Sequence, residues 1–336
     1  MDTTLKTIIP INSIDAFNVS SKENNDANNK TRETIINDII NNSIPQEYFT
    51  ISERWNTLNL ELDKYIQSLV DEDIIITNIE CKQMGGRGYN YDFLIIINKT
   101  LRFNIEFKFN ASKISHTPQF VSLMKPSQYM SRSFEKYFYD NYLPKIAAFG
   151  ELNIPPKEEY LHELHQIAPP CMSKFTQLYD EGKPKKKKSE KGCAFYKYSK
   201  KESKTAIYSF LQNTTLKSDI LSNYLSQSQK HKVYMLYKDG TIYKETLPDE
   251  LYKIKPHSVV VKGPNFICET VAGYKLKILL RWKNGNGIAF PAFQISRHIP
   301  NVTDLKQLCL THNLELNKKK RKADIQDLLD SNKIIY

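Results

Sequence analysis

The sequence predicts an α/β protein, and three observations lead to that class. Between about residues 52 and 69, apolar residues recur at spacings of three and four, which is typical of one face of a helix. Short segments rich in β-branched and aromatic residues follow, and a helical pattern then returns at Ser127–Tyr142. This order indicates a mixed sheet flanked by helices.

The first 70 residues divide into a polar part and a helical part. Residues 1–30 are Asn-rich and hold little that can be buried, so they are predicted to form a disordered lead-in. From Thr34 the apolar pattern predicts a helix that Pro45 ends, and a second helix begins at about Ser52. The first apolar face is Ile35, Ile36, Ile39 and Ile40; the second is Trp55, Leu58, Leu62, Tyr65, Ile66 and Leu69.

Three strands are predicted next, over Ile74–Ile79, Tyr91–Ile97 and Leu101–Phe109. The second is apolar on both faces, which indicates an internal strand. The third alternates, with apolar residues on one face and Arg102, Asn104, Glu106 and Lys108 on the other. A further strand is expected at Lys145–Phe149, and residues 31–182 are assigned to one core domain.

The second half of the chain is predicted to be mixed α and β. Residues 183–192 form a basic linker or loop, and residues 193–302 an α+β region that is a possible site of DNA recognition. Within that region Lys201–Gln229 is expected to be helical. Two hairpins follow, Lys232–Glu245 through an Asp-Gly turn and Lys275–Ile295 through an Asn-Gly turn. Residues 303–336 form a small helical module.

Composition excludes several classes of protein. The 336 residues are 40% hydrophobic, which argues against wholesale disorder, and the apolar runs are too short for a membrane-spanning helix. Five scattered cysteines without a CxxC pair argue against a disulfide framework and a structural zinc site. We therefore expect an intracellular protein, cytoplasmic or nuclear, and the composition is also compatible with a viral origin. The net charge of +11 favours nucleic acid as the partner.

One hairpin carries the candidate chemistry. If the chain reverses at Asn98–Thr100, Asp92 and Glu106 face one another, because each lies seven residues from Lys99. Lys108 shares their face. Two opposed carboxylates repel unless a cation lies between them, and oxygen ligands of this kind suit Mg²⁺, with Mn²⁺ as a substitute. Alternatively, Lys108 alone compensates both acids on a surface hairpin.

This stretch resembles the PD-(D/E)xK nuclease superfamily, with its restriction-endonuclease-like core, over roughly residues 50–150. The match is Asp92 followed by Ile105-Glu106-Phe107-Lys108, and Tyr91 stands where the family often has proline. The resemblance implies that Asp92 and Glu106 bind the metal and that Lys108 positions or activates the attacking water. It also implies a polar residue on the following helix and an acid on the preceding one. Our choices are Gln119, with Gln128 in reserve, and Glu53 or Glu61.

A glycine-rich segment precedes the first acid. Gly85, Gly86 and Gly88 would let the backbone approach a phosphate closely, and Arg87 could bind that phosphate with two hydrogen bonds. A flexible turn is the equal alternative.

The C-terminal module resembles a SAP-type helix, loop and helix. The resemblance implies that Leu305, Leu308 and Leu314 pack against Ile325, Leu328 and Leu329. Its loop is longer than the usual form, and a generic helical hairpin is the alternative. The phosphate-binding residues expected in the loop are Lys318, Lys319, Lys320, Arg321 and Lys322.

Together these features predict a Mg²⁺-dependent endonuclease that hydrolyses double-stranded DNA, with or without sequence specificity. Two alternatives stay open. One is a non-catalytic DNA-binding or packaging protein built on a nuclease fold, and the other is an RNA endonuclease. No membrane partner is expected, and a homodimer is compatible with the sequence.

Overall fold

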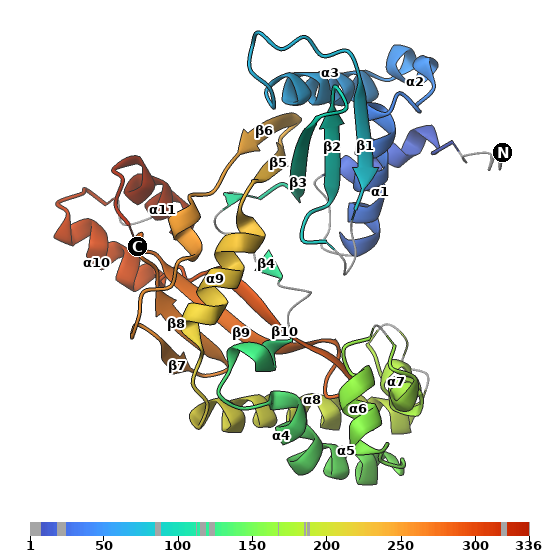
Figure 1. The fold of residues 1–336 in the computed structure, drawn as a ribbon, viewed down its shortest axis with the longest axis vertical. Coiled ribbons are helices and arrows are strands. Elements are labelled where there is room, and N and C mark those ends of the chain that lie inside the picture. The colour runs from blue at the N-terminus through green and yellow to red at the C-terminus, as the bar shows by residue number, and fades with distance from the viewer. Residues whose placement is uncertain are drawn as a thin grey trace. The chain divides into compact units, whose positions relative to one another are not determined.

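The chain is a mixed α/β protein that divides into two compact units. The computed structural model describes residues 8–18, 25–84, 89–111, 113–114, 119–120, 125–166, 168–184, 186, 189–316 and 321–335. One unit comprises Met1–Thr117 and Gln229–Pro248, and the other comprises Pro118–Ser228 and Asp249–Tyr336 (Figure 1). Each unit is therefore built from two separate stretches of the chain.

The first unit contains a five-stranded mixed sheet of order β1-β2-β3-β5-β6. Its strands are β1 (Ile79–Gln83), β2 (Phe93–Ile97), β3 (Leu101–Phe109), β5 (Lys232–Lys238) and β6 (Thr241–Glu245). Strand β2 pairs antiparallel with both β1 and β3, whereas β5 pairs parallel with β3. The hairpin predicted at Lys232–Glu245 is confirmed, but it completes the first unit's sheet. The local sequence does not indicate that β5 pairs with β3, because parallel strands are joined by a long crossover connection and therefore lie far apart in the sequence.

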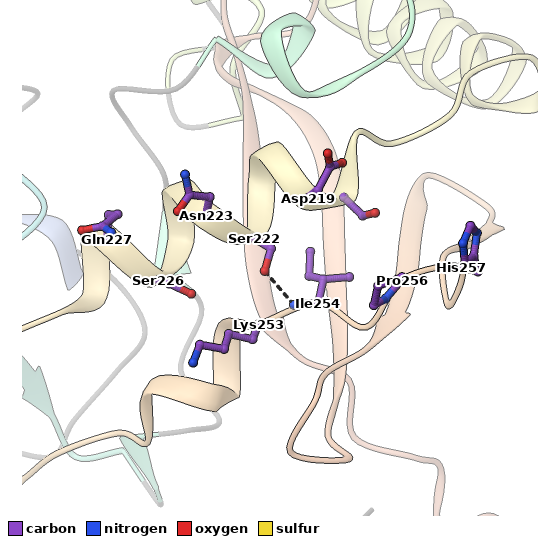
Figure 2. Close-up of a pocket in the computed structure, with 10 residues that line it drawn as sticks. Asp219, Ser222, Asn223, Ser226, Gln227, Lys253, Ile254, Pro256 and His257 are labelled. Atoms are coloured by element: carbon purple, nitrogen blue, oxygen red, sulfur yellow. Dashed lines mark hydrogen bonds between the residues drawn. The ribbon is translucent and has the colours of Figure 1, made fainter.

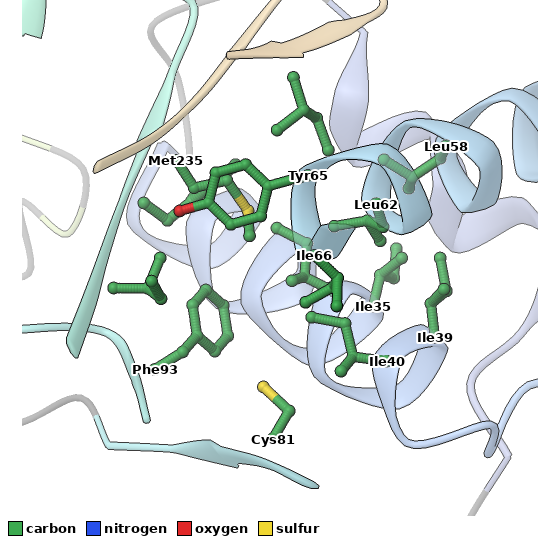
Figure 3. Close-up of a cluster of buried hydrophobic side chains, with 14 of the residues drawn as sticks. Ile35, Ile39, Ile40, Leu58, Leu62, Tyr65, Ile66, Cys81, Phe93 and Met235 are labelled. Carbon is green, nitrogen blue, oxygen red and sulfur yellow. The ribbon is translucent and has the colours of Figure 1, made fainter. Parts of the chain in front are cut away.

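Helices provide the other half of the first unit's core. They are α1 (Asn25–Ile40), α2 (Gln46–Ile51) and α3 (Glu53–Gln67), with the 3-10 helix η1 (Ile11–Phe17) before them. The predicted apolar faces of α1 and α3 are buried against the sheet. Figure 3 shows Ile35 and Ile39 of α1 and Leu62 of α3 gathered with Phe93 and Met235 of the strands.

The N-terminal segment differs from the predicted disordered lead-in where the structure describes it. Ile14 and Phe17 are buried in the core, because η1 supplies apolar side chains to the space beside α3. The Trp55 Nε1–H donates to the Ile11 carbonyl at 2.8 Å, and the Arg32 Nε–H to the Ala16 carbonyl at 2.6 Å. Residues 1–7 and 19–24 lie outside the described part of the chain.

The first strand begins later than predicted. β1 starts at Ile79, whereas the predicted strand was Ile74–Ile79. The residues before it are held by the amide of Asn98, whose Oδ1 accepts from the Thr77 N–H at 2.8 Å and whose Nδ2 donates to the Ile75 carbonyl at 2.8 Å. The side chain of Ile75 is 81% exposed, so the β-branched residues of this segment do not mark a buried strand.

The second unit contains an antiparallel sheet of order β4-β10-β9-β8-β7. The predicted hairpin at Lys275–Ile295 is confirmed as β9 and β10. The strands are β4 (Gln119–Phe120), β7 (Val260–Lys262), β8 (Asn265–Glu269), β9 (Lys275–Gly285) and β10 (Ala289–Arg297). The remaining helical elements are η3 (Pro126–Tyr129), α4 (Phe134–Asn141), α5 (Leu143–Gly150), α6 (Lys157–Glu163), η4 (Pro170–Met172), α7 (Ser173–Glu181), α8 (Glu190–Gln212), α9 (Ser218–Gln229), η5 (Asp249–Tyr252), α10 (Val302–Thr311) and α11 (Lys322–Ser331).

Two predicted elements of this region need correction. The strand predicted at Lys145–Phe149 is wrong, because these residues lie in α5, where Pro144 occupies the first turn and alanines follow. The helix predicted at Ser127–Tyr142 is shorter. α4 begins at Phe134, where the Ser133 hydroxyl caps the helix by accepting from the Lys136 N–H at 3.2 Å.

The two C-terminal helices pack on one another as their apolar pattern predicts. Leu305 and Cys309 of α10 and Ile325 and Leu329 of α11 are fully buried. The predicted partners that are partly buried around them are Leu308, Leu314 and Leu328. No helix in the described ranges is both long enough and apolar enough to cross a membrane.

The return of residues 229–248 to the first sheet has a consequence for stability. Met235 of β5 is fully buried in the first unit's core, so Met235→Ala should lower the unfolding free energy by about 2–5 kcal/mol. Tyr243→Thr on β6, where Tyr243 is 47% exposed, should change it by no more than about 0.5 kcal/mol. Urea unfolding followed by Trp55 fluorescence in a Trp282→Phe background reports on the first unit. Equal effects of the two variants would contradict this packing.

Candidate functional site

The hairpin of β2 and β3 sets the position of the two predicted acids. Phe93 pairs with Ile105 and Ile97 with Leu101, which confirms the predicted register. Asp92 directly precedes β2, and its N–H donates to the Ile105 carbonyl at 2.9 Å. Its Oδ2 accepts from the Phe107 N–H at 2.8 Å. The Asp92 carboxylate is therefore fixed on the backbone beside Glu106.

Glu106 lies between two lysines. Its Oε1 is 2.5 Å from the Lys108 Nζ, and its Oε2 is 2.8 Å from the Lys232 Nζ. Lys108 is two residues along β3, whereas Lys232 begins β5, which pairs parallel to β3. The side chains differ in exposure: 21% for Lys108 but only 3% for Lys232. Lys232 is thus the buried counterion of Glu106, and Lys108 is the one that reaches solvent.

A third carboxylate comes from α1. The Oε2 of Glu33 accepts from the Gln83 Nε2 at 3.1 Å. Glu33 is half-buried, and its charge acts on Asp92 while the charges of Glu106 and Lys108 act on Glu33. Glu33 therefore belongs to the same group, which we call the carboxylate cluster: Glu33, Asp92, Glu106, Lys108 and Lys232.

The electrostatics of the carboxylate cluster separate its acids. Burial, and then the charges of Glu106 and Glu33, raise the pKa of Asp92 to about 7. Burial, and to a smaller extent the charge of Glu106, also raise the pKa of Glu33. Burial alone would raise the pKa of Glu106, but the charges and hydrogen bonds of Lys108 and Lys232 outweigh it and lower that pKa. The cluster thus combines an ionised Glu106 with an Asp92 that is costly to ionise.

The acids of the carboxylate cluster are chemically suited to a divalent cation, because Mg²⁺ and Mn²⁺ prefer hard carboxylate oxygens. The positions of Asp92, Glu106 and Glu33 do not bring three ligand atoms within 4.8 Å of one another; in the described residues Glu159, Glu163 and Cys171 do so. A cation beside Asp92 would offset the repulsion that raises its pKa.

The other residues predicted for this site lie in different surroundings. Glu53, in the first turn of α3, lines a cavity of about 240 Å³ together with Phe17 and Tyr237. Glu61 accepts from the Ile242 N–H at 3.1 Å and lies 2.7 Å from the Lys64 Nζ. Neither glutamate is among the groups whose charges act on Asp92 in the described part of the chain.

The two glutamines belong to the second unit. Gln119 is in β4, where its backbone pairs with Ile295 of β10, so it is not a member of the first unit's sheet. Gln128 lies in η3 and is exposed.

Most of the predicted phosphate-binding residues fall outside the described residues. These are Arg87 and Lys318, Lys319 and Lys320. Arg321 and Lys322 are described and exposed. Arg321 is the N-cap of α11, where its N–H donates to the Asp324 Oδ2 at 2.8 Å. Lys322 is the first residue of that helix.

Sequence reasoning missed Lys232 and Glu33. Nothing near Lys232 in the sequence indicates that its strand lies beside β3. Glu33 did carry a signal, because it precedes Ile36 and Ile40 by three and seven residues and therefore lies on the apolar face of α1. A carboxylate at such a position needs a polar partner in the fold.

The second unit contains a larger cavity of different character. Its volume is about 640 Å³, and it lies between α9 and the segment Lys253–His257 (Figure 2). Hydroxyl and amide groups predominate, and the Ser222 Oγ accepts from the Ile254 N–H at 2.9 Å. Asp219 is the single carboxylate among its lining residues, so this cavity lacks the paired acids of the carboxylate cluster.

Comparison of the chain with protein-family models, with curated proteins and with solved structures found no match in any of the three.

The raised pKa of Asp92 makes stability depend on pH. The folded protein holds this proton up to about pH 7, whereas the unfolded chain loses it near about 3.9. Between these values the folded state binds more protons, so stability falls as pH rises, by roughly 1.4 kcal/mol for each unit that separates the two pKa values. Asp92→Asn lacks this dependence, and in EDTA it should gain stability relative to the wild type from pH 4 to pH 7.

Urea unfolding of both proteins across this pH range measures the difference. Asp71→Asn, at an exposed position, controls for the loss of a carboxylate and should follow the wild type. Parallel profiles for the wild type and Asp92→Asn would show that Asp92 ionises in the folded protein as it does in the unfolded chain.

Proposed function

We propose that the protein is a metal-dependent nuclease that hydrolyses phosphodiester bonds in double-stranded DNA. The observation that carries the proposal is the carboxylate cluster itself. Asp92 directly precedes β2, and the charge of Glu106 on β3 acts on it. Glu33 adds a third acid, and Lys108 shares the site with access to solvent. The net charge of +11 supports a polyanionic substrate.

In this proposal the acids hold Mg²⁺, or Mn²⁺ in its place. Asp92 and Glu106 would be its ligands, and Glu33 adds negative charge to the site. When bound, the metal supplies Lewis-acid stabilisation of the charge that develops on the phosphate. Its charge also allows Asp92 to ionise at neutral pH despite burial.

The two lysines take different roles. Lys232 is buried and is one of the two counterions of Glu106, so this carboxylate keeps a partner besides Lys108. In this proposal the Lys108 ammonium group, which reaches solvent, orients the attacking water by donating a hydrogen bond to it. A single lysine beside Glu106 would have to serve both purposes.

Cleavage of supercoiled plasmid tests the proposal. With Mg²⁺ or Mn²⁺ the wild type should nick or linearise the plasmid, and EDTA should abolish the reaction. Asp92→Ala, Glu106→Ala and Lys108→Ala should each lower the rate by roughly 10²–10⁴-fold. Glu80→Gln on β1 is a matched control, because Glu80 is half-exposed and paired with Lys82.

Single-stranded DNA and RNA of the same sequence serve as parallel substrates. Preferential cleavage of RNA would replace the proposed substrate with the RNA alternative. No cleavage of any nucleic acid with either metal would favour the non-catalytic DNA-binding alternative. If all three variants cut at the wild-type rate, the chemistry lies elsewhere in the chain.

A second test distinguishes the acids on the two helices. Mn²⁺ binding is measured by isothermal titration calorimetry without DNA, so the result does not depend on cleavage. We expect Glu33→Gln to weaken Mn²⁺ binding by roughly tenfold or more, because it removes a charge from the carboxylate cluster. Glu53→Gln should leave the affinity unchanged. The reverse order would assign the helix ligand to α3.

A further inference from the structure

A row of lysines occupies the exposed face of α8. Lys197, Lys200, Lys201 and Lys204 are all exposed and recur at spacings of three and four. Such spacings place them along one side of a helix, and Tyr208 extends the same row by one further turn. The opposite face is buried and contains Phe195, Ser199, Ser203, Ala206 and Phe210. We call the four lysines the α8 stripe.

The ammonium groups of the α8 stripe have no carboxylate partner among the residues that the structure describes. In the described part of the chain, none of the four lies within ion-pair distance of a carboxylate. Lys200 and Lys204 each lie 5.9 Å from a tyrosine ring, of Tyr196 and Tyr208 respectively. Rings attract these cations but leave their charge in place.

Neighbouring lysines provide a contrast. Lys183 lies 2.6 Å from Asp180, and Lys186 lies 3.7 Å from the same residue. Lys191, at the start of α8, lies 2.6 Å from Glu151. The basic linker predicted at residues 183–192 is therefore partly compensated where the structure describes it. The three linker lysines that the structure describes are thus paired with carboxylates, whereas the four lysines of the α8 stripe are not.

The α8 stripe also lowers the intrinsic stability of the helix that carries it. Each of its four lysines has two others three or four positions away, and like charges at these spacings destabilise a helix. A polyanion along the row would remove this repulsion. The arrangement thus has an electrostatic cost in the free protein that a bound partner would offset.

We infer that the α8 stripe binds the phosphate backbone of double-stranded DNA. From Lys197 to Lys204 the helix rises about 10 Å. Duplex DNA carries about six charges over that length, so four lysines match a short stretch of backbone. The apolar side of α8 packs on α5 and α7 and does not face solvent, unlike that of a helix that inserts into a lipid surface.

This inference rests on the proposed function for its choice of duplex DNA, but its test does not require cleavage. Binding of a fluorescein-labelled duplex is measured by anisotropy in EDTA at several salt concentrations. The stripe variant replaces Lys197, Lys200, Lys201 and Lys204 with Gln. A control variant makes the same change at Lys136, Lys145, Lys174 and Lys217, exposed lysines that lie in or beside α4, α5, α7 and α9.

We expect the stripe variant to lose about 0.9 from the slope of log affinity against log salt for each lysine that contacts a phosphate. The control variant should keep the wild-type slope. Without DNA at low salt, the stripe variant should also have a higher thermal midpoint, because the repulsion along α8 is gone. If the stripe variant does not fold, Lys200→Gln with Lys204→Gln gives the same comparison against Lys136→Gln with Lys174→Gln.

Three outcomes would overturn the inference. Equal loss of slope in the stripe and control variants would mean that only net charge matters. No duplex binding by the wild type would remove the partner. Stripe-dependent binding to phosphatidylserine vesicles without stripe-dependent DNA binding would assign the surface to membranes. Binding by the α8 stripe does not require the carboxylate cluster, so Asp92→Asn should bind DNA with the wild-type slope. A failed cleavage assay together with intact stripe-dependent binding would therefore contradict the proposed function but not this inference.

Discussion

The partly buried carboxylate of Glu106 is the group on which the arrangement of the first unit depends. A charge in this position is tolerated only with close counterions, and one of them, Lys232, is 126 residues away in the sequence. The ion pair forms only when β5 lies parallel to β3, so the chemistry of one side chain and the topology of the sheet require each other. The same strand pairing buries Met235 beside α1 and α3. The ion pair between Lys232 and Glu106 and the burial of Met235 therefore both require the same position of β5.

The acids Asp92 and Glu106 differ in character although they lie in the same cluster. Glu106 has two lysines and a lowered pKa, whereas Asp92 is buried near other acids and has a raised one. When environments separate neighbouring titratable groups in this way, they commonly serve different roles. Here the two lysines keep Glu106 ionised, whereas burial and the neighbouring acids disfavour the ionised form of Asp92.

Local pattern was sufficient for much of this unit. The alternation of β3 and the turn around Lys99 predicted the register of β2 with β3, and the apolar spacing of α3 predicted its buried face. The predicted pairing of Asp92 with Glu106 lies just beyond the last paired residues, Phe93 and Ile105. Parallel pairing of β5 was not predictable, because its partner strand is chosen by tertiary packing. Residues 145–149 failed for another reason: a short apolar run fits a strand and a buried helix equally well. Glu33 was missed because the role of an acid on a helix depends on which strand ends the fold places next to it.

The interruption of the first sheet also affects how the chain is made. About 120 residues separate the end of β3 from the start of β5, and a ribosome adding 5–20 residues per second needs roughly 6–25 s to supply them. During synthesis β3 is thus an edge strand with open backbone groups, which is the kind of surface that other chains can join. Its outward charges, Arg102, Glu106 and Lys108, are of the type that discourages such pairing. Residues that we assign to catalysis in the finished protein would thereby protect the nascent one from aggregation.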